Sequence, residues 1–569
     1  MRWIMSMVFA VGALGSAGCL QAQDANDRDW RDPYDSGGPL IVEQAAYDVT
    51  YYDLALKVDP TDSTIAGSLC MQARMVAPAE VVAFDLDTLL AIESVSLTDL
   101  ESAAPLPYRR SGSRVFVELP FTKQPGEDLS LTVKYGGAPR VAQRPPWNGG
   151  FQWAETPSGQ PWIGTSNQMI GADVWWPNKD HVSDKPDSMA IRVTVPAALV
   201  VATNGRLEKV TDNGDGTNTY DWFVSTPISN YNVSLNIAPY ETLQEDYHSV
   251  TGETFPVIFW VLPESIEQAR AFMPEIIAHL RWFEENLGPY PFRADKYGVA
   301  MTPYLGMEHQ SIIAYGANFN NGAMTGGEDW GFDALHHHEL SHEWWGNLVT
   351  NADWKDMWIH EGFGTYMQAL WLEDTQGIER YHEFMASIRP RIENQQATAP
   401  RHSLSAQEVY GSDIYFKGAW VLHTLRYLLG EDEVREALRR MAYPSEAAAL
   451  ATDGSQVRFV STADVVTVFD EVSGEDLAWL FEAYLRQAEL PVLWAEIEHG
   501  EGERTMELRW QVPGDLPFPM PVPVRLADRT AVVDMTEGVG TLQVPAGIEP
   551  VIDPENWILR AAASPQPRE

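Results

Sequence analysis

Cysteine is almost missing from this sequence, which has only Cys19 and Cys70 among its 569 residues. Disulfide bonds are therefore excluded as the main source of stability, and a chain of this length must rely on its hydrophobic cores. A structural zinc site is also disfavoured, because such sites are normally completed by cysteine thiolates. We expect Cys70, which lies in the strand-like run GSLCMQARM, to be a small buried residue.

Basic residues and long apolar runs are scarce as well. The 39 lysines and arginines stand against 80 acidic residues, and the formal net charge is −41. Nucleic acid is excluded as a partner, because its binding requires basic side chains that displace counterions. After the first two dozen residues, no apolar run reaches the ~18 residues that a membrane-spanning helix needs.

The chain starts with MRWIMSMVFAVGALGSAGCLQAQD, which combines one arginine, an apolar run and small residues. This pattern is typical of an export signal, which we place at residues 1–22, and we interpret residues 23–44 as a tether. The residues before Cys19 resemble a bacterial lipoprotein cleavage site, so lipidation of Cys19 and simple secretion both stay open. We expect an exported protein, periplasmic or extracellular, whose membrane contact would come only from an outer-membrane lipid anchor at Cys19.

The remaining sequence has the composition of a well-packed protein, with 45% hydrophobic and 21% charged residues. Alternating polar and apolar residues, as in YYDLALKVD, predict an antiparallel β domain over residues 45–245. Residues 246–490 show helical spacing and are predicted to form a second, helical domain. Alternation returns in residues 491–569, which indicates a small closing β domain. The predicted fold class is multidomain α+β.

The segment LHHHELSHEWWGN contains one register with metallopeptidase spacing, His338-Glu339-Leu340-Ser341-His342. On a helix, His338 and His342 lie one turn apart on the same face, so both imidazoles reach one Zn²⁺ while Glu339 lies beside it. About 0.04 such matches are expected by chance in a chain of this composition. The third ligand is predicted to be Glu361, separated from His342 by 18 residues, at the start of an adjacent helix. One zinc ion per chain is expected.

These motifs closely resemble the zinc aminopeptidases typified by aminopeptidase N and leukotriene-A hydrolase. The resemblance rests on HELSHEWWGNLVT, the 18-residue gap and WIHEGFGTY, and it extends over most of the chain. It implies a saddle-shaped N-terminal β domain followed by a thermolysin-like catalytic domain.

The same resemblance assigns residues to the substrate. The stretch YLGMEHQS implies that Glu308, with Gly306 and Met307, binds the free α-amino group of a peptide, and GTSNQM implies that Gln168 contacts the same amine. A cationic amine and a carboxylate in a partly dry pocket attract each other strongly. DIYFKG implies that Tyr415 stabilises the oxyanion.

Four positions depart from the family pattern. Leu305 stands where glycine is usual, His309 and His360 replace asparagine, and Asp173 replaces arginine. The first two changes flank the predicted amine site.

The expected function is hydrolysis of the N-terminal peptide bond by a zinc-activated water, with Glu339 as the general base. The partners are peptides with a free N-terminus. Two alternatives stay open: a thermolysin-type endopeptidase, and a peptide-binding lipoprotein without catalysis.

Other conspicuous residues receive no catalytic role. We expect His336 and His337 to face solvent or to pack behind the site, and Trp344 and Trp345 to anchor the core. Lys417 is interpreted either as an aid in placing Tyr415 or as a solvated helix charge.

Overall fold

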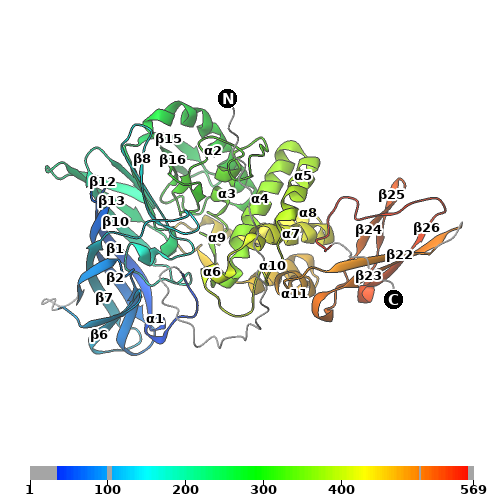
Figure 1. Cartoon of the computed structure of the whole chain (residues 1–569), viewed down its shortest axis with the longest axis horizontal. Helices are drawn as coiled ribbons and strands as arrows, with labels where there is room; N and C mark the ends of the chain where they lie inside the picture. Colours follow the sequence, from blue (N-terminus) through cyan, green and yellow to red (C-terminus); the bar gives the residue numbers. More distant parts are fainter. Residues whose placement is uncertain (1–34, 99–104, 499–501, 562–569) are drawn as a thin grey trace, which may run out of the picture.

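The computed structural model describes residues 35–98, 105–498 and 502–561. The predicted export signal at 1–22, Cys19 and most of the predicted tether lie outside these residues. The end of that tether is described: Ser36 is buried and α1 spans Val42–Ala45. In Figure 1 the β-rich N-terminal part, the helical middle and the C-terminal strands follow one another along the long axis.

The N-terminal part is built from three sheets. The largest has the strand order β12-β13-β10-β1-β2-β7-β4, and the two smaller ones have the orders β11-β14-β9-β8 and β3-β6-β5. The strands are β1 Tyr47–Asp59, β2 Thr64–Met75, β3 Ala79–Asp85, β4 Leu90–Leu97, β5 Tyr108–Ser111, β6 Arg114–Lys123, β7 Asp128–Gly137, β8 Gly150–Glu155, β9 Pro161–Ser166, β10 Ser188–Pro196, β11 Val200–Thr203, β12 Arg206–Asp212, β13 Thr217–Val224 and β14 Leu235–Ala238.

Two expectations for this part are corrected. Strands β1 and β10 pair in parallel, so the large sheet is mixed and not purely antiparallel. A long excursion through the smaller sheets separates these two strands, which allows the chain to enter both in the same direction. Cys70 lies on β2 and is only partly buried, with its Sγ 3.8 Å from the hydroxyl oxygens of Thr98 and Ser130.

The middle part contains a sheet that the helical spacing did not predict. Its order is β15-β16-β17-β19-β18, and the predicted domain boundary at residue 245 falls inside β15. The strands are β15 Glu241–His248, β16 Thr254–Val261, β17 Tyr297–Met301, β18 Gly306–Met307 and β19 Ile313–Tyr315, with a separate pair of β20 Val349–Asn351 and β21 Arg458–Val460.

Helices form most of the rest of the middle part, and in Figure 1 most of them lie between β15–β16 and the C-terminal strands. They are α2 Ile266–Leu287, α3 Ala334–Ser341, α4 Trp358–Gln376, α5 Ile378–Ile388, the 3-10 turn η6 Arg389–Arg391, α6 Ala406–Val409, α7 Ser412–Leu429, α8 Glu431–Ala442, α9 Glu446–Leu450, α10 Thr462–Ser473 and α11 Ala478–Leu485. Of the described helices, none combines the length and the apolar character required to cross a bilayer.

Helices α4 and α7 cross at a pair of glycines. A Cβ atom on Gly362 would lie 2.8 Å from the Cα of Gly418, and one on Gly418 would lie 2.9 Å from the Cα of Gly362. Any larger residue would push the helices apart. This contact brings the start of α4, which carries Glu361, against the start of α7, which carries Tyr415.

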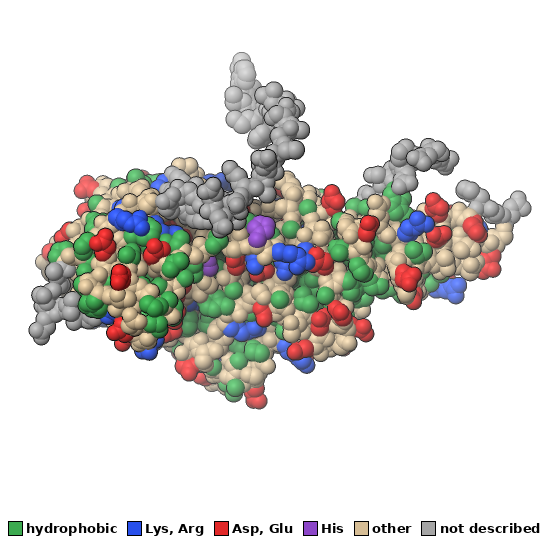
Figure 2. Space-filling model, turned by 90° about the horizontal axis from the view of Figure 1, so that it is seen from below, with side chains coloured by type: hydrophobic (Ala, Val, Ile, Leu, Met, Phe, Trp, Pro, Cys, Tyr) green, Lys and Arg blue, Asp and Glu red, His purple; other side chains and the backbone are tan. Residues whose placement is uncertain are grey.

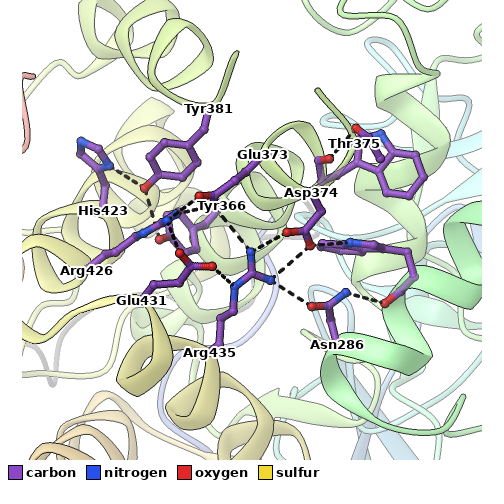
Figure 3. A network of polar contacts seen from close by, with 12 residues as sticks. Asn286, Tyr366, Glu373, Asp374, Thr375, Tyr381, His423, Arg426, Glu431 and Arg435 are labelled. Atoms are coloured by element: carbon purple, nitrogen blue, oxygen red, sulfur yellow. Dashed lines mark hydrogen bonds and ion pairs between the residues drawn. The ribbon is translucent and has the colours of Figure 1, made fainter. Parts of the chain in front are cut away.

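A partly buried ionic network joins the far ends of the same helices (Figure 3). Arg426 of α7 makes two hydrogen bonds of 2.5 and 2.6 Å to Glu373 of α4, and a third of 2.9 Å to Glu431 of α8. Arg435 of α8 pairs with Asp374 at 2.8 Å. Bidentate pairing of this kind holds two helices in one relative orientation.

The C-terminal part has two three-stranded sheets, in the orders β22-β23-β26 and β25-β24-β27. The strands are β22 Val492–Ile497, β23 Arg504–Gln511, β24 Val522–Leu526, β25 Arg529–Val533, β26 Val539–Val544 and β27 Val551–Ile552. The chain then returns to the helices, where the carbonyl oxygens of Asn556 and Leu559 contact His423 Nε2 at 3.1 Å and Tyr484 OH at 2.7 Å. Acidic side chains are scattered over the face shown in Figure 2 and do not gather in one patch.

Candidate active site

Helix α3 carries the predicted zinc motif. Asp333 caps it, because its Oδ1 accepts a 2.9 Å hydrogen bond from the backbone N–H of His336. The helix ends at Ser341, so His342 is the C-cap residue, but its backbone remains α-helical with φ −69° and ψ −15°. His338 and His342 therefore keep the one-turn spacing that the motif requires.

The three predicted ligands converge. The Nε2 atoms of His338 and His342 are 3.2 Å apart, and Glu361 Oε2 lies 3.4 and 3.5 Å from them. His342 Nδ1 donates to the carbonyl oxygen of Trp345 at 2.9 Å, which leaves the lone pair of Nε2 facing the other two ligands.

These residues fit a zinc ion. One ligand atom from each lies within 4.8 Å of the others, and all three side chains are buried. Two imidazoles and one carboxylate form the donor set of catalytic zinc, which keeps a fourth position for water or substrate. Glu361 Oε2 is a buried oxygen without a hydrogen-bond partner, as expected for an atom reserved for a metal.

The electrostatics of the ligands are consistent with this fit. Burial alone would raise the pKa of Glu361, but the adjacent His342 and His338 rings bring it below its ordinary value. Burial lowers the pKa of His342 to about 4. The site therefore presents an ionised carboxylate and a neutral imidazole, the forms that bind metal.

Glu339 lies against β18. A Cβ atom on Gly306 would lie only 2.6 Å from Glu339 Oε1 and 2.6 Å from Leu335 Cδ1, so a larger residue here would displace the Glu339 carboxylate. Burial, with the added charges of Glu308 and Glu361, raises the pKa of Glu339 well above its usual range. A carboxyl group with a raised pKa can hold and release a proton near neutral pH.

Glu308 and Gln168 form the other end of the site. Gln168 Nε2 donates to Glu308 Oε1 at 2.6 Å and approaches Glu361 Oε1 at 3.2 Å. The backbone oxygen of Glu308 accepts hydrogen bonds from the side-chain amides of Asn232 and Asn347. Burial and the charge of Glu361 raise the pKa of Glu308 to about 8.

Two tyrosines face the ligands from the α6–α7 region. The ring of Tyr415 stacks on that of His338, with centroids 6.1 Å apart and an interplanar angle of 26°. Its hydroxyl group is hydrogen-bonded to that of Tyr410, the C-cap residue that follows α6. Tyr410 was not predicted from the sequence. The only available signal was its position five residues before Tyr415, which no local rule connects to a contact across a helix break.

The histidines that precede the ligands are buried, so the expectation that they face solvent is wrong and the packing alternative is confirmed. His336 contacts His279 Nδ1 at 2.9 Å through its own Nδ1 and Tyr297 OH at 2.8 Å through Nε2. His337 is enclosed by aromatic rings, among them Phe283 at 4.7 Å. Sequence spacing could not reveal this cluster, because His279 lies on α2.

Lys417 and the two tryptophans were also assigned in advance. Lys417 is fully buried and donates to the carbonyl oxygens of Gln487 and Ala488 at 3.1 and 2.9 Å, so its interpretation as a solvated helix charge is wrong, and its role in placing Tyr415 stays a prediction. Trp344 and Trp345 are fully buried, which confirms their role in the core.

All the predicted site residues line one cleft of about 500 Å³. Its walls come from β18, α3, α4, α5, η6, α7 and two loops of the N-terminal part. The lining residues are Pro146, Trp147, Gln168, Leu305, Gly306, Met307, Glu308, Ala323, Met324, Thr325, Glu328, Trp330, Leu335, His338, Glu339, His342, Glu361, Thr365, Gln368, Phe384, Ser387, Ile388, Arg391, Tyr410, Gly411, Ser412, Tyr415 and Phe416. This volume is within the range of small-ligand sites.

The converging histidines, the carboxylate from the next helix and the adjacent glutamate are the arrangement of a metallopeptidase of the HExxH class. Comparison with known families is more specific. Residues 49–232 match the Peptidase M1 N-terminal domain, and residues 275–484 match the Peptidase family M1 domain. The chain belongs to peptidase family M1, and the predicted family and zinc ligand set are confirmed.

Several curated relatives are similar over part of their length. Aminopeptidase N of Haemonchus contortus is 24% identical over 445 residues, covering 73% of this chain and 41% of the relative. Aminopeptidase N of Streptomyces lividans is 26% identical over 348 residues, covering 55% and 37%. Leukotriene A-4 hydrolase of Xenopus laevis is 24% identical over 415 residues, covering 68% and 64%. The chain thus spans less than two thirds of these relatives.

Solved structures match more completely. An M1 zinc metallopeptidase from Deinococcus radiodurans is 24% identical, with a TM-score of 0.64, over 80% of this chain and 98% of that one. A mutant of the same enzyme bound to a Tyr-Ser-Ala substrate is 25% identical, with a TM-score of 0.63 and the same coverage. These likenesses confirm the predicted multidomain α+β fold.

Proposed function

We propose that the protein is a zinc-dependent aminopeptidase that removes single residues from the N-terminus of peptides. The observation that carries the proposal is the contact of Gln168 with both Glu308 and the ligand Glu361. Through the Gln168 amide, the carboxylate of Glu308, which can bind an ammonium group, is linked to the metal ligand Glu361. A peptide whose amine lies at Glu308 presents only its first peptide bond to the zinc ligands.

The chain's own residues supply the remaining chemistry. Zinc held by His338, His342 and Glu361 would lower the pKa of a bound water and polarise the scissile carbonyl. Glu339 would accept a proton at its carboxylate and deliver it to the departing amine. Tyr415 would donate a hydrogen bond from its hydroxyl group to the developing oxyanion, with Tyr410 holding that hydroxyl in place. The buried walls of the cleft strengthen each of these interactions.

The test compares free and N-acetylated peptides of the same sequence, with and without a zinc chelator. We expect rapid release of the first residue from the free peptide, at least ~100-fold slower cleavage of the acetylated one, and loss of both with chelator. Equal cleavage of the two peptides would instead indicate an endopeptidase. Absence of any turnover by the zinc-loaded protein would favour a non-catalytic peptide-binding protein.

We also propose that the protein is exported and that Cys19 is lipidated. Residues 1–22 support this proposal through their apolar run and the small residues before Cys19. Metabolic labelling with a fatty acid, with Cys19→Ser as the control, tests it. Label on the natural protein that disappears in the variant is the expected outcome, and unlabelled but exported protein would indicate simple secretion.

A further inference from the structure

The cleft has an uneven distribution of charge. Four of its lining residues are acidic, Glu308, Glu328, Glu339 and Glu361, and among the described lining residues Arg391 is the only lysine or arginine. A positive charge in an otherwise acidic cleft marks the place where a ligand of opposite sign is most favoured. The elements around Arg391 show what kind of anion it could bind.

Arg391 ends the 3-10 turn η6 and is exposed. Its guanidinium stacks over the ring of Phe416, with the central carbon 4.7 Å from the ring centroid. Among the described residues no carboxylate lies within ion-pair distance of it. Stacking fixes the plane of a guanidinium while its N–H groups remain available for a bidentate partner.

The backbone next to Arg391 is held in place from α7. Asp413 accepts hydrogen bonds of 2.7 Å from the backbone N–H groups of both Glu393 and Asn394. Its carboxylate is thereby engaged by two donors, which reduces its repulsion of a nearby anion. The turn that carries Arg391 is thus anchored to the first turn of α7.

The start of α7 opens into the same cleft. Gly411, its N-cap residue, has no side chain to cap the helix, and a Cβ atom placed there would meet nothing within 4 Å. Ser412 also lines the cleft, and its hydroxyl oxygen is buried without a hydrogen-bond partner. An uncapped helix N-terminus, a free hydroxyl and an unpaired guanidinium together make a corner that suits a carboxylate.

This corner is close to the reaction site. Ser412 and Tyr415 are three residues apart on α7, which corresponds to about 4.5 Å along the helix axis. An extended peptide spans roughly 3.3–3.6 Å per residue. The axial separation of Ser412 and Tyr415 is thus about one or two residues of an extended peptide, and both side chains line the same cleft.

We propose that Arg391, Ser412 and the N-terminus of α7 bind the C-terminal carboxylate of the substrate, so that the enzyme prefers dipeptides and tripeptides. This inference rests on the proposed aminopeptidase function and adds the substrate class. Glu308 would bind the amine at one end of the cleft, and Arg391 would bind the carboxylate at the other. Long peptides lack a carboxylate at this distance and would gain nothing from the corner.

The experiment measures kcat/KM for three substrates, Ala-Ala-Ala, its C-terminal amide, and Ala-Ala-Glu amide, by quantifying released alanine. The natural enzyme should prefer the free acid over its amide by about tenfold, mainly through KM, because a charge-assisted hydrogen bond is lost with the amide. In Arg391→Gln this ratio should fall to about one, and Arg391→Lys should restore part of it.

Arg401→Gln is the matched control. Arg401 is exposed, pairs with Glu482 and does not line the cleft, so its loss changes the net charge equally and should leave the tenfold ratio intact. The proposal is overturned if Arg391→Gln keeps the ratio, or if the natural enzyme shows none. It is also overturned if Ala-Ala-Glu amide has the same kcat/KM as the free acid, since the corner would then bind an acidic side chain and not specifically the C-terminal carboxylate.

Failure of the proposed function gives a different result. If alanine is released from none of the three substrates, aminopeptidase activity is refuted. Carboxylate binding by the corner is then tested by a binding measurement. Calorimetry with Glu339→Gln then compares the tripeptide acid with its amide. Tighter binding of the acid, removed by the additional change Arg391→Gln, would support the corner, and equal binding would refute it.

Discussion

Helix α3 separates two histidine clusters that share one stretch of sequence but differ in chemistry. On one side, His338 and His342 meet Glu361 and face the cleft. On the other side, His336 and His337 meet His279 among aromatic rings. Both clusters are buried, so burial alone does not make a metal site.

What differs is where the lone pairs point. In the cleft cluster both Nε2 atoms are directed at one carboxylate oxygen. In the rear cluster the Nδ1 atoms of His279 and His336 face each other at 2.9 Å, so one must donate and the other accept. Burial lowers the pKa of His336 to about 3, which keeps it neutral. A shared proton consumes the lone pair that a metal would need.

The largest effect is expected from removing the carboxylate of the cleft cluster. Glu361→Gln should lose zinc and reduce kcat/KM by on the order of 10³-fold or more, because catalytic zinc needs three protein ligands. Zinc content by mass spectrometry and turnover of an alanine amide provide the measurement. The matched control is Glu275→Gln, which changes an acid beside the rear cluster, with Oε1 3.6 Å from His279 Nε2, and should keep full zinc. Equal zinc loss in both would remove the distinction between the clusters.

The next effect separates metal binding from proton transfer. Glu339→Gln should retain one zinc per chain while kcat falls by about 10²–10⁴-fold, since the general base is lost. Steady-state kinetics and zinc analysis of the same preparation test this expectation. Residual activity within tenfold of the natural enzyme would assign the proton transfer to another group.

The rear cluster should govern stability and not metal binding. His337→Ala removes a ring enclosed by Phe283, Phe332 and Trp371, and should cost about 2–4 kcal/mol of unfolding free energy with zinc content unchanged. Urea unfolding of the chelated protein measures it. His337→Phe keeps most of the packing and should recover much of the loss. Loss of zinc from His337→Phe would show that the clusters are coupled.

The smallest expected effect is a shift in acid stability. Burial and the neighbouring histidines lower the pKa of His337 well below its usual value, so the unfolded chain binds more protons here. The contribution of neutral His337 to the unfolding free energy is present above the pKa of ~6.5 in the unfolded chain. It is lost as the pH falls towards the pKa of His337 in the folded protein. His337→Phe removes the loss of stability that protonation of His337 in the unfolded chain causes. The acid-unfolding midpoint of the chelated protein should therefore move to lower pH. An unchanged midpoint would mean that His337 does not titrate during unfolding.

Local spacing predicted the centre of the site well. The four-residue interval between His338 and His342 and the 18 residues before Glu361 were sufficient to name the ligands, because a helix turn fixes which side chains share a face. Periodicity also located the β-rich ends of the chain. It missed the sheet from β15 to β19, whose strands are separated by the long helix α2 and by irregular loops.

Contacts between distant segments were not predictable in the same way. Tyr410 reaches Tyr415 across a break between two helices, and Gly362 meets Gly418 only because α4 crosses α7. Arg391 carries no motif, and its place in the cleft follows from the turn that Asp413 anchors. Such contacts depend on how whole elements pack, which a single sequence does not encode at any fixed interval.

The sequence by itself determined the identity of the zinc ligands, the adjacent proton carrier and the alternation of β and helical regions, because each depends on local periodicity or on motifs at fixed intervals along the chain. Only the tertiary structure decided which histidines remain free for a metal, which glycines let α4 and α7 approach, and where a lone arginine enters an acidic cleft. These features arise when remote side chains are buried together, and burial is a property of the packed chain.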